Sequence, residues 1–427
     1  MVSVNLHLVC YIIAMSKKIF LLATLLLAML NIGAVSITGT RLENTFESEK
    51  NLALFDYTKS ESSEEDFLDS THFYLQTMAA GKEIYTWFGH SGLVVVNEKY
   101  GFERCYDWGV FAFSPTFYFD FIFGRLYYSL MVTNPKYSIV QAEVENRELI
   151  RRELDIPREA KRGIIDFLNY NSLDENTTYL YHHYLDNCAT RIRDIYNAST
   201  NGEFKAWAQS IETNKSYRDY TTSLMGRSFI VNWTLNFLQG PSIDKKLNLW
   251  EACFLPYVLD QAIEEYTGEE KIVINAGKEN TFSDNNPVLE ATTVALIIFV
   301  LLVWSYSKNR RLWAFIISIL LLFFTILSCV LIFMMCFSNH DVTYFNENII
   351  YVNPLLFLAL FSSLRALFSR KKREATMCLS VMKISFVLTL ILIILKGLFM
   401  GVFIQDNFAQ ICFMLIIYFS AFTLKRP

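Results

Sequence analysis

The chain has 427 residues, of which 53% are hydrophobic and 36 are phenylalanine, and its net charge is −4. This composition is typical of a membrane protein rather than of a soluble domain. The slightly negative charge excludes the basic surface that nucleic-acid binding requires, so we expect no nucleic-acid partner.

The N-terminus has the pattern of a secretory signal over residues 1–36. A basic start at Lys17 precedes the apolar run 19–30, and small residues follow where a signal peptidase cleaves. We favour cleavage over an uncleaved anchor, because the apolar run is short for a full membrane span. Met15 is an alternative initiator. Residues 37–67 are polar and predict an exposed N-terminal segment.

A histidine stands at the start of a predicted β-hairpin. Residues 93–96 form one strand, 97–103 a turn and 104–111 the returning strand. The reversal brings Asp107 near His90, where a carboxylate can orient an imidazole and stabilise its cation. The competing interpretations are a structural histidine and a surface aspartate.

The segment after the hairpin is rich in aromatic residues. Between residues 111 and 130 we expect most rings in the core and some against a bilayer. Arg125 within this segment either binds a lipid phosphate or pairs with a nearby acid. Residues 137–154 predict strands, and the apolar pattern of 157–169 predicts a helix against the core.

A cysteine then opens a helix. Asp186 and Asn187 are residue types that begin helices, and Ile192 and Ile195 supply its apolar face. Cys188 therefore falls in the first turn, where unpaired N–H groups favour the thiolate, which is the reactive form. The same N–H groups can hold an oxyanion. A buried structural cysteine is the competing interpretation.

Two adjacent histidines precede this helix. On an extended chain His182 and His183 point in opposite directions, so they are not a metal pair. One of them is an alternative base for Cys188. The sequence shows no zinc-type cysteine spacing or phosphate loop, so we expect no metal and no cofactor.

Three cysteines lie in the segment predicted to be exported. An odd number in an oxidising compartment leaves one thiol free or paired elsewhere. A Cys105–Cys253 bridge would leave Cys188 reactive, and this pairing is a hypothesis.

From residue 288 the chain becomes strongly apolar. Lysine and arginine follow the first, third and fifth apolar runs, whereas loops 338–348 and 401–407 contain neither. The positive-inside rule then puts the preceding domain outside the cytoplasm, in agreement with the export signal. The predicted spans are 288–306, 312–337, 349–368, 377–399 and 408–424.

Five spans exceed what a simple anchor needs, so the membrane part is expected to take part in function. His340, Asn348 and Asn353 are polar and lie on the outer side. They are candidates for contacts with a lipid or an acceptor, and a solvated loop is the alternative.

Together these motifs resemble the bacterial lipoprotein N-acyltransferase (Lnb) family and, more widely, the permuted papain-like NlpC/P60 proteins that include lecithin:retinol acyltransferase. The similarity covers about residues 73–264 and, more weakly, the membrane region. Asp107 departs from the family, whose members often carry Asn there. The matching stretches are Phe88-Gly89-His90-Ser91, Tyr106-Asp107-Trp108-Gly109-Val110-Phe111, Gly124-Arg125-Leu126-Tyr127-Tyr128, Asp186-Asn187-Cys188-Ala189-Thr190-Arg191-Ile192-Arg193-Asp194, Ser216-Tyr217-Arg218 and Phe254-Leu255-Pro256.

The resemblance implies an α+β, permuted papain-like (NlpC/P60-like) exported domain over 68–276. A linker, 277–287, and an all-α five-helix transmembrane domain, 288–427, would follow. It implies an inner-membrane protein with its catalytic domain in the periplasm.

The resemblance also implies an acyltransferase. Cys188, His90 and Asp107 would move an acyl chain from a membrane phospholipid, through a thioester, to the N-terminal amine of a lipoprotein. Asn187 and Tyr184 are candidate substrate or oxyanion contacts. A cell-wall cysteine peptidase or amidase and a non-catalytic membrane scaffold are the rival functions.

Overall fold

The computed structural model describes residues 61–111, 116–369 and 372–424. The predicted signal and the first part of the N-terminal segment, residues 1–60, lie outside this description. The described residues divide into two compact units. We call residues 61–227 and 245–283 the α/β unit, and residues 228–244 and 284–424 the helical unit.

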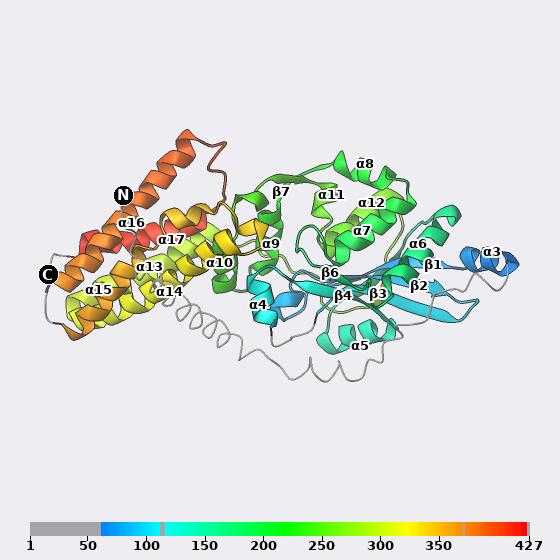
Figure 1. Ribbon diagram of the computed structural model, residues 1–427, viewed down its shortest axis with the longest axis horizontal. Helices are drawn as coiled ribbons and strands as arrows, with labels where there is room; N and C mark the ends of the chain where they lie inside the picture. The colour runs from blue at the N-terminus through cyan, green and yellow to red at the C-terminus, as the bar shows by residue number, and fades with distance from the viewer. Residues whose placement is uncertain (1–60, 112–115, 370–371, 425–427) are drawn as a thin grey trace, which may run out of the picture. The chain divides into compact units, whose positions relative to one another are not determined.

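A seven-stranded antiparallel sheet forms the centre of the α/β unit (Figure 1). Its order is β6-β4-β3-β2-β1-β5-β9. The predicted hairpin is confirmed and lies in the middle of this order, so its strands are covered on both faces. This double coverage explains why the run Leu93 to Val95 is fully buried. The strands are β1 (His72–Met78), β2 (His90–Asn97), β3 (Phe102–Val110), β4 (Tyr127–Thr133), β5 (Leu149–Glu153), β6 (Thr178–Leu180) and β9 (Ile272–Asn275).

Helices cover both faces of the sheet. In Figure 1, α7 and α12 lie over one face and α5 lies over the other. The predicted helix at 157–169 is confirmed as α6 and buries Ile164, Ile165 and Leu168, which recur at helical spacing. The helices are α3 (Glu61–Asp69), α4 (Phe117–Ile122), α5 (Lys136–Glu145), α6 (Arg158–Asn171), α7 (Cys188–Ser199), α8 (Glu203–Gln209), α9 (Tyr217–Met225), α11 (Leu249–Ala252) and α12 (Pro256–Thr267), with a small sheet of β7 (Glu212–Ser216) and β8 (Lys246–Asn248).

The structure corrects two local predictions. The strand-rich region expected at 137–154 contains a helix, α5, followed by the single strand β5. The β-branched residues Val140 and Val144 are exposed, and only Ala142 of α5 is buried. Within the segment predicted to be exposed, Phe67 is buried against the hairpin residues Tyr100 and Phe102.

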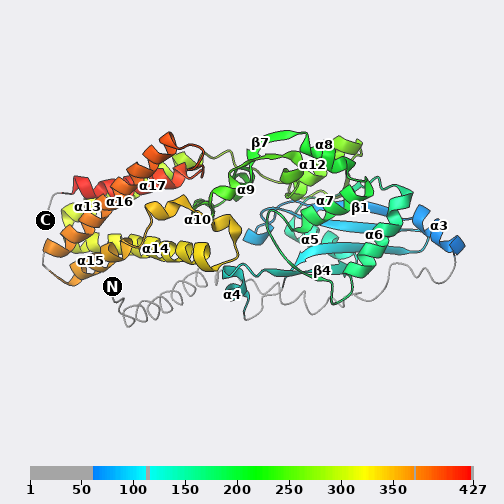
Figure 2. The same ribbon diagram turned by 45° about the horizontal axis from the view of Figure 1, so that its top comes forward.

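The helical unit contains the predicted apolar runs (Figure 2). Within the described residues, α13, α14 and α16 are long and apolar enough to cross a membrane, whereas α15 and α17 are shorter. The third run was predicted to start at residue 349, but α15 starts later, because a 3₁₀ turn and Pro354 occupy its first part. The helices are α13 (Pro287–Lys308), α14 (Arg310–Phe337), α15 (Leu356–Phe368), α16 (Lys372–Leu398) and α17 (Phe408–Thr423).

One segment assigned to the exported domain by sequence belongs to the helical unit instead. Helix α10 (Phe229–Leu238) packs with α13 and α17. The side-chain amides of Asn346 and Asn348 donate to the Phe237 carbonyl at 2.9 and 2.7 Å. The helix buries Trp233 and Phe237 in the hydrophobic core of the helical unit.

A buried ion pair joins the last turn of α16 to the 3₁₀ turn Glu347–Ile350 in the helical unit. Lys396 Nζ lies 2.5 Å from Glu347 Oε2, and both side chains are less than 10% exposed. Gln405 completes the cluster, since its backbone N–H donates to Glu347 Oε1 and its carbonyl accepts from Lys396 Nζ. Such satisfied pairing is what allows charged groups to be buried at all.

Candidate functional site

Cys188 is the first residue of α7, and the residue before it explains why. The Asn187 side chain accepts hydrogen bonds from the N–H groups of Ala189 and Thr190, both at 2.9 Å. In return the Thr190 hydroxyl accepts the Asn187 backbone N–H at 2.8 Å. This reciprocal capping box fixes the start of the helix at the cysteine.

The cap has a chemical consequence for the first turn. Because Asn187 occupies the N–H groups of Ala189 and Thr190, these two donors are not open to a substrate. The N–H of Cys188 itself has no partner within its own helix, as is general for the first turn. It is therefore the helix-end donor best placed for an oxyanion formed at the adjacent sulfur.

The Asn187 side-chain amide is also fully used. It donates to the carbonyls of His183 and Phe254 at 2.7 and 2.9 Å. The side chain that the sequence analysis offered as an oxyanion contact therefore positions the helix instead. On the same loop, Arg191 holds the Asp186 carboxylate with two bonds of 2.7 and 2.9 Å.

His90 is the first residue of β2, directly after Gly89, where the backbone passes close to the carbonyl of Met78 on β1. Gly89 has φ +76°, and a Cβ there would lie 2.9 Å from the Met78 carbonyl, so only glycine fits. Across the hairpin, Leu93 pairs with Tyr106. Extending that register places Asp107 diagonal to His90, which brings the two side chains within reach. His90 Nε2 lies 2.6 Å from Asp107 Oδ1.

The structure brings His90 and Cys188 together as well. A Cβ placed on Gly109 would lie 3.2 Å from His90 Cε1 and 3.9 Å from the Cβ of Cys188. The Asp107 carboxylate hydrogen-bonds the imidazole, and Cys188 is close enough to act on the charge of the ring. Since Nε2 contacts Asp107, Nδ1 is the nitrogen left for the sulfur. The three predicted residues thus form one constellation.

The electrostatics of this constellation favour a charged imidazole. Burial of the ring works against the cation, but the negative charges of Asp107 and Cys188 outweigh it, and the pKa of His90 is raised well above its usual 6.5. An imidazole held by a carboxylate beside a sulfur is the arrangement in which a histidine can take and return the proton of a nucleophile.

The other two thiols of the α/β unit are in a different environment. Cys105 and Cys253 are both free and buried, so the hypothetical bridge between them is wrong. Burial raises the pKa of the Cys105 thiol, and it raises the pKa of Cys253 to about 12. Cys188 alone of the three is partly accessible.

The neighbouring candidates from the sequence occupy distinct places. Tyr184 is 3% exposed and packs against Tyr217 and Phe254, so it belongs to the core. Burial lowers the pKa of His183 to about 4, and its ring packs on Phe88. His182 accepts backbone N–H groups of its own turn. Neither histidine replaces His90 beside the sulfur.

The remaining candidates lie apart from this constellation. Arg125 is exposed and its guanidinium lies 5.4 Å from the Phe123 ring centre. In the helical unit, Asn348 is completely buried and its side chain bonds Phe237, Tyr351 and Asn407. Asn353 caps its own turn, and His340 starts a 3₁₀ turn. The geometry of Asn348 is that of a structural residue.

Two residues that matter for the geometry were missed by the sequence analysis. Gly109 gives the imidazole and the sulfur room to meet, and Thr190 completes the helix cap. Gly109 has φ +136° beside an irregularity between β3 and β4. A glycine inside a predicted strand is the signal that marks such a close approach.

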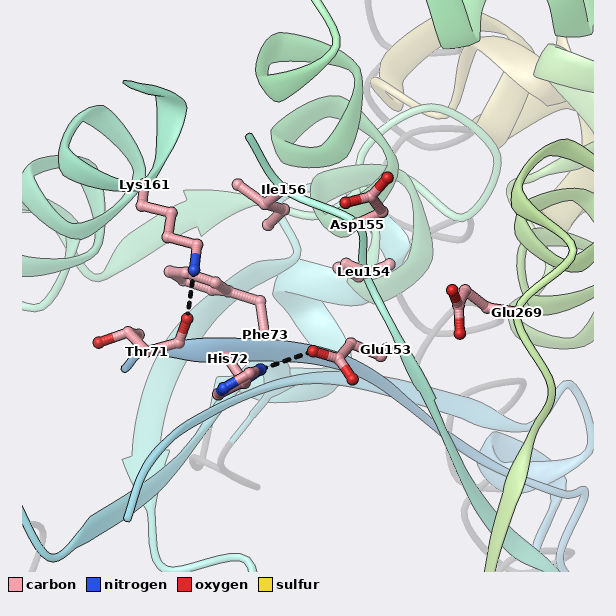
Figure 3. A pocket seen from close by; sticks show the side chains of 9 residues that line it. All are labelled: Thr71, His72, Phe73, Glu153, Leu154, Asp155, Ile156, Lys161 and Glu269. Carbon is pink, nitrogen blue, oxygen red and sulfur yellow. Dashed lines mark hydrogen bonds and ion pairs between the residues drawn. The ribbon is translucent and has the colours of Figure 1, made fainter. Parts of the chain in front are cut away.

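A polar pocket of about 310 Å³ lies elsewhere on the α/β unit (Figure 3). His72 and Glu153 meet there at 2.6 Å, and Lys161 donates to the Thr71 carbonyl. His72 is at the opposite end of β1 from Met78, which pairs with His90. None of the nine lining residues is a cysteine or serine, so this pocket offers no nucleophile of that kind.

Fold and site together define a class: a mixed α/β domain that carries a Cys-His-Asp constellation, joined to a bundle of apolar helices. Comparison with known families agrees. Residues 61–222 match the Lnb N-terminal periplasmic domain, and residues 278–425 match the Lnb transmembrane domain. The two matches span more than two thirds of the chain, which therefore belongs to the Lnb family. No curated protein and no solved structure matches it.

Membership has direct consequences. The protein is a membrane protein with a periplasmic domain, and family membership implies a lipoprotein N-acyltransferase-type function. The predicted α+β domain followed by a helical membrane domain is confirmed. The catalytic details rest on the site described above.

Proposed function

We propose that this protein transfers a fatty acyl chain from a membrane phospholipid to the N-terminal amine of a diacylglyceryl-cysteine lipoprotein, through a thioester on Cys188. The observation that carries the proposal is the partly exposed thiol at the start of α7, which lies beside an imidazole that Asp107 holds. Family membership supports the choice of acceptor.

The first half-reaction forms the thioester. The Cys188 sulfur attacks the ester carbonyl while its proton resides on His90, and the Cys188 N–H faces the developing oxyanion. The carbon–oxygen bond to glycerol then breaks. His90 gives the proton to the leaving alkoxide, which departs as a lysophospholipid.

The second half-reaction forms an amide. The free amine of the lipoprotein attacks the thioester carbonyl, His90 takes the proton of the amine, and the carbon–sulfur bond breaks to regenerate the sulfur. Asp107 stabilises the imidazolium in both steps. A covalent intermediate divides a difficult ester-to-amide exchange into two easier ones.

The proposed setting is the inner membrane, with five spans and the catalytic domain in the periplasm. Charged residues at the ends of the apolar helices support this orientation. Lys308 closes α13 and Arg365 lies in the last turn of α15, on the side expected to be cytoplasmic.

The decisive experiment expresses the protein in cells that lack their own lipoprotein N-acyltransferase. We expect mass spectrometry of lipoprotein N-termini to show an added acyl chain with the wild type and none with Cys188→Ala. Cys336→Ser is the matched control, since Cys336 is an exposed free thiol on α14 of the helical unit, and it should retain acylation.

Free N-terminal amines with the well-expressed wild type would overturn the proposal. A change in cell-wall fragments that depends on Cys188 would instead favour the peptidase or amidase function. Acylation that persists in Cys188→Ala would remove the thiol mechanism while leaving the acceptor in place.

A further inference from the structure

A series of stacked aromatic rings runs through the α/β unit close to the constellation. Tyr181 stacks on Tyr128 with ring centres 4.3 Å apart, and Tyr128 stacks on Phe111 at 4.9 Å. From Phe111 the series divides to Phe117 at 5.6 Å and to Tyr85 at 6.0 Å. We call these five residues the aromatic track.

The Tyr181 end of the track lies in the neighbourhood of Cys188, since burial and then the charge of Cys188 raise the pKa of the Tyr181 hydroxyl. Phe111 is two residues beyond Gly109, and a Cβ built on Gly109 would point toward both His90 and Cys188. Tyr128 neighbours Ser129, which pairs with Val110 of β3. The Tyr181 hydroxyl lies 3.2 Å from His183 Nδ1, on the turn that leads into α7.

The outer end of the track reaches solvent. Tyr85 is 64% exposed. Phe117 contacts Phe121, which is 47% exposed, and Phe119 on the same short helix is 53% exposed. Most rings of residues 111–130 were predicted in the core and some against a bilayer, and Phe119 and Phe121 are not in the core. Exposed rings of this kind suit contact with a lipid surface better than with water.

An acyl group on Cys188 must place its hydrocarbon chain somewhere. Each methylene that leaves water gains about fourfold in an equilibrium constant. A row of rings that begins at the turn leading into α7 and ends at exposed apolar side chains offers such a surface, whereas the acidic and basic groups of the pocket in Figure 3 do not.

We propose that the aromatic track binds the fatty acyl chain of the donor, with the carbonyl at Cys188 and the chain lying along Tyr128 and Phe111 toward Tyr85. This inference rests on the proposed function and names the residues that select the donor by chain length. Tyr128 and Phe111 act here as binding residues, and the reaction itself is that described above.

The test measures thioester formation on Cys188 by intact-protein mass spectrometry, using the full chain in detergent micelles. The donors are dipalmitoyl and dihexanoyl phosphatidylethanolamine. We expect the wild type to prefer the palmitoyl donor, and Phe111→Ala and Tyr128→Ala to lower the palmitoyl-to-hexanoyl rate ratio about tenfold, as loss of apolar contact in a binding pocket does. Tyr85→Ser at the exposed end should lower the ratio less.

Phe167→Ala is the matched control, because this ring is 42% exposed on α6 and outside the track, and it should keep the wild-type ratio. If Phe111→Ala or Tyr128→Ala fails to fold, Tyr85→Ser still tests the inference, because the Tyr85 ring is mostly in solvent and its loss should not unfold the protein. An unchanged ratio in all three track variants overturns the inference, as does an equal loss with both donors. If the wild type forms no thioester with either donor, the proposed function itself fails, and that result is distinct from both.

Discussion

Replacing Gly109 by alanine tests whether the imidazole and the sulfur must meet as closely as the structure has them. The new methyl group would lie 3.2 Å from His90 Cε1, whereas carbon atoms rest about 3.5–4.0 Å apart. The ring must therefore move by a few tenths of an ångström. The residue also has φ +136°, where a side chain costs about 1–3 kcal/mol.

The magnitude of the effect follows from this displacement. Because a misplacement of about 1 Å costs about 100-fold in rate, a shift of a few tenths predicts a loss of about five- to tenfold. We would measure the rate of thioester formation on Cys188 together with the thermal unfolding midpoint. The expected result is a slower rate in a protein that still folds, with a modestly lower midpoint.

The control is Gly163→Ala in the exposed middle of α6. Nothing lies within 4 Å of a Cβ at that position, so alanine should leave the rate unchanged and stabilise the helix by about 0.5–1 kcal/mol. A wild-type rate in Gly109→Ala would show that the contact with His90 is not part of the reactive geometry, and the reasoning would be refuted.

Three further predictions concern the same unit. Asp107→Asn removes the charge that holds the pKa of His90 above 6.5, so the alkaline limb of the pH–rate profile should move to lower pH. An alkaline limb that does not move would show that this limb does not report the titration of His90. The raised pKa of His90 also predicts how the free energy of unfolding changes with pH. Its stabilising contribution is fully present below pH 6.5 and is lost as the pH rises through the raised pKa. Asp260→Ala removes the bidentate partner of the fully buried Arg152 guanidinium, which keeps Glu264 at 3.1 Å, so the free energy of unfolding in urea should fall by about 1–3 kcal/mol, whereas an unchanged value would contradict burial of the pair. Iodoacetamide followed by peptide mapping should modify Cys188 and spare the two buried thiols of the α/β unit; modification of either buried thiol at a similar rate would argue against their burial.

Local sequence patterns were enough to locate the parts of the site. The residues Asp186-Asn187-Cys188 predict a capped helix start, because the capping hydrogen bonds are made within a few residues of one another. The hairpin register likewise depends on one turn and one run of apolar residues, so His90 and Asp107 could be expected to meet. The apolar runs after residue 287 identified the membrane helices by length and composition alone.

Contacts between distant segments could not be obtained in this way. Local propensity did not decide whether Val140 and Val144 belong to a strand or to a helix. Their state depends on how α5 packs against one face of the sheet, which leaves both side chains exposed. Helix α10 joins the membrane helices because Asn346 and Asn348, more than 100 positions later, satisfy the carbonyl of Phe237.

The sequence alone therefore predicted which residues meet in the Cys-His-Asp constellation and that the chain enters a membrane, since both depend on short-range patterns of capping, alternation and hydropathy. Only the tertiary structure decided that one of the three thiols of the α/β unit is accessible, that Asn187 and Asn348 are structural, and that rings from separate segments pack into one row. Those features arise from side chains packed from separate strands and helices, and their burial and distances exist only once the chain has folded.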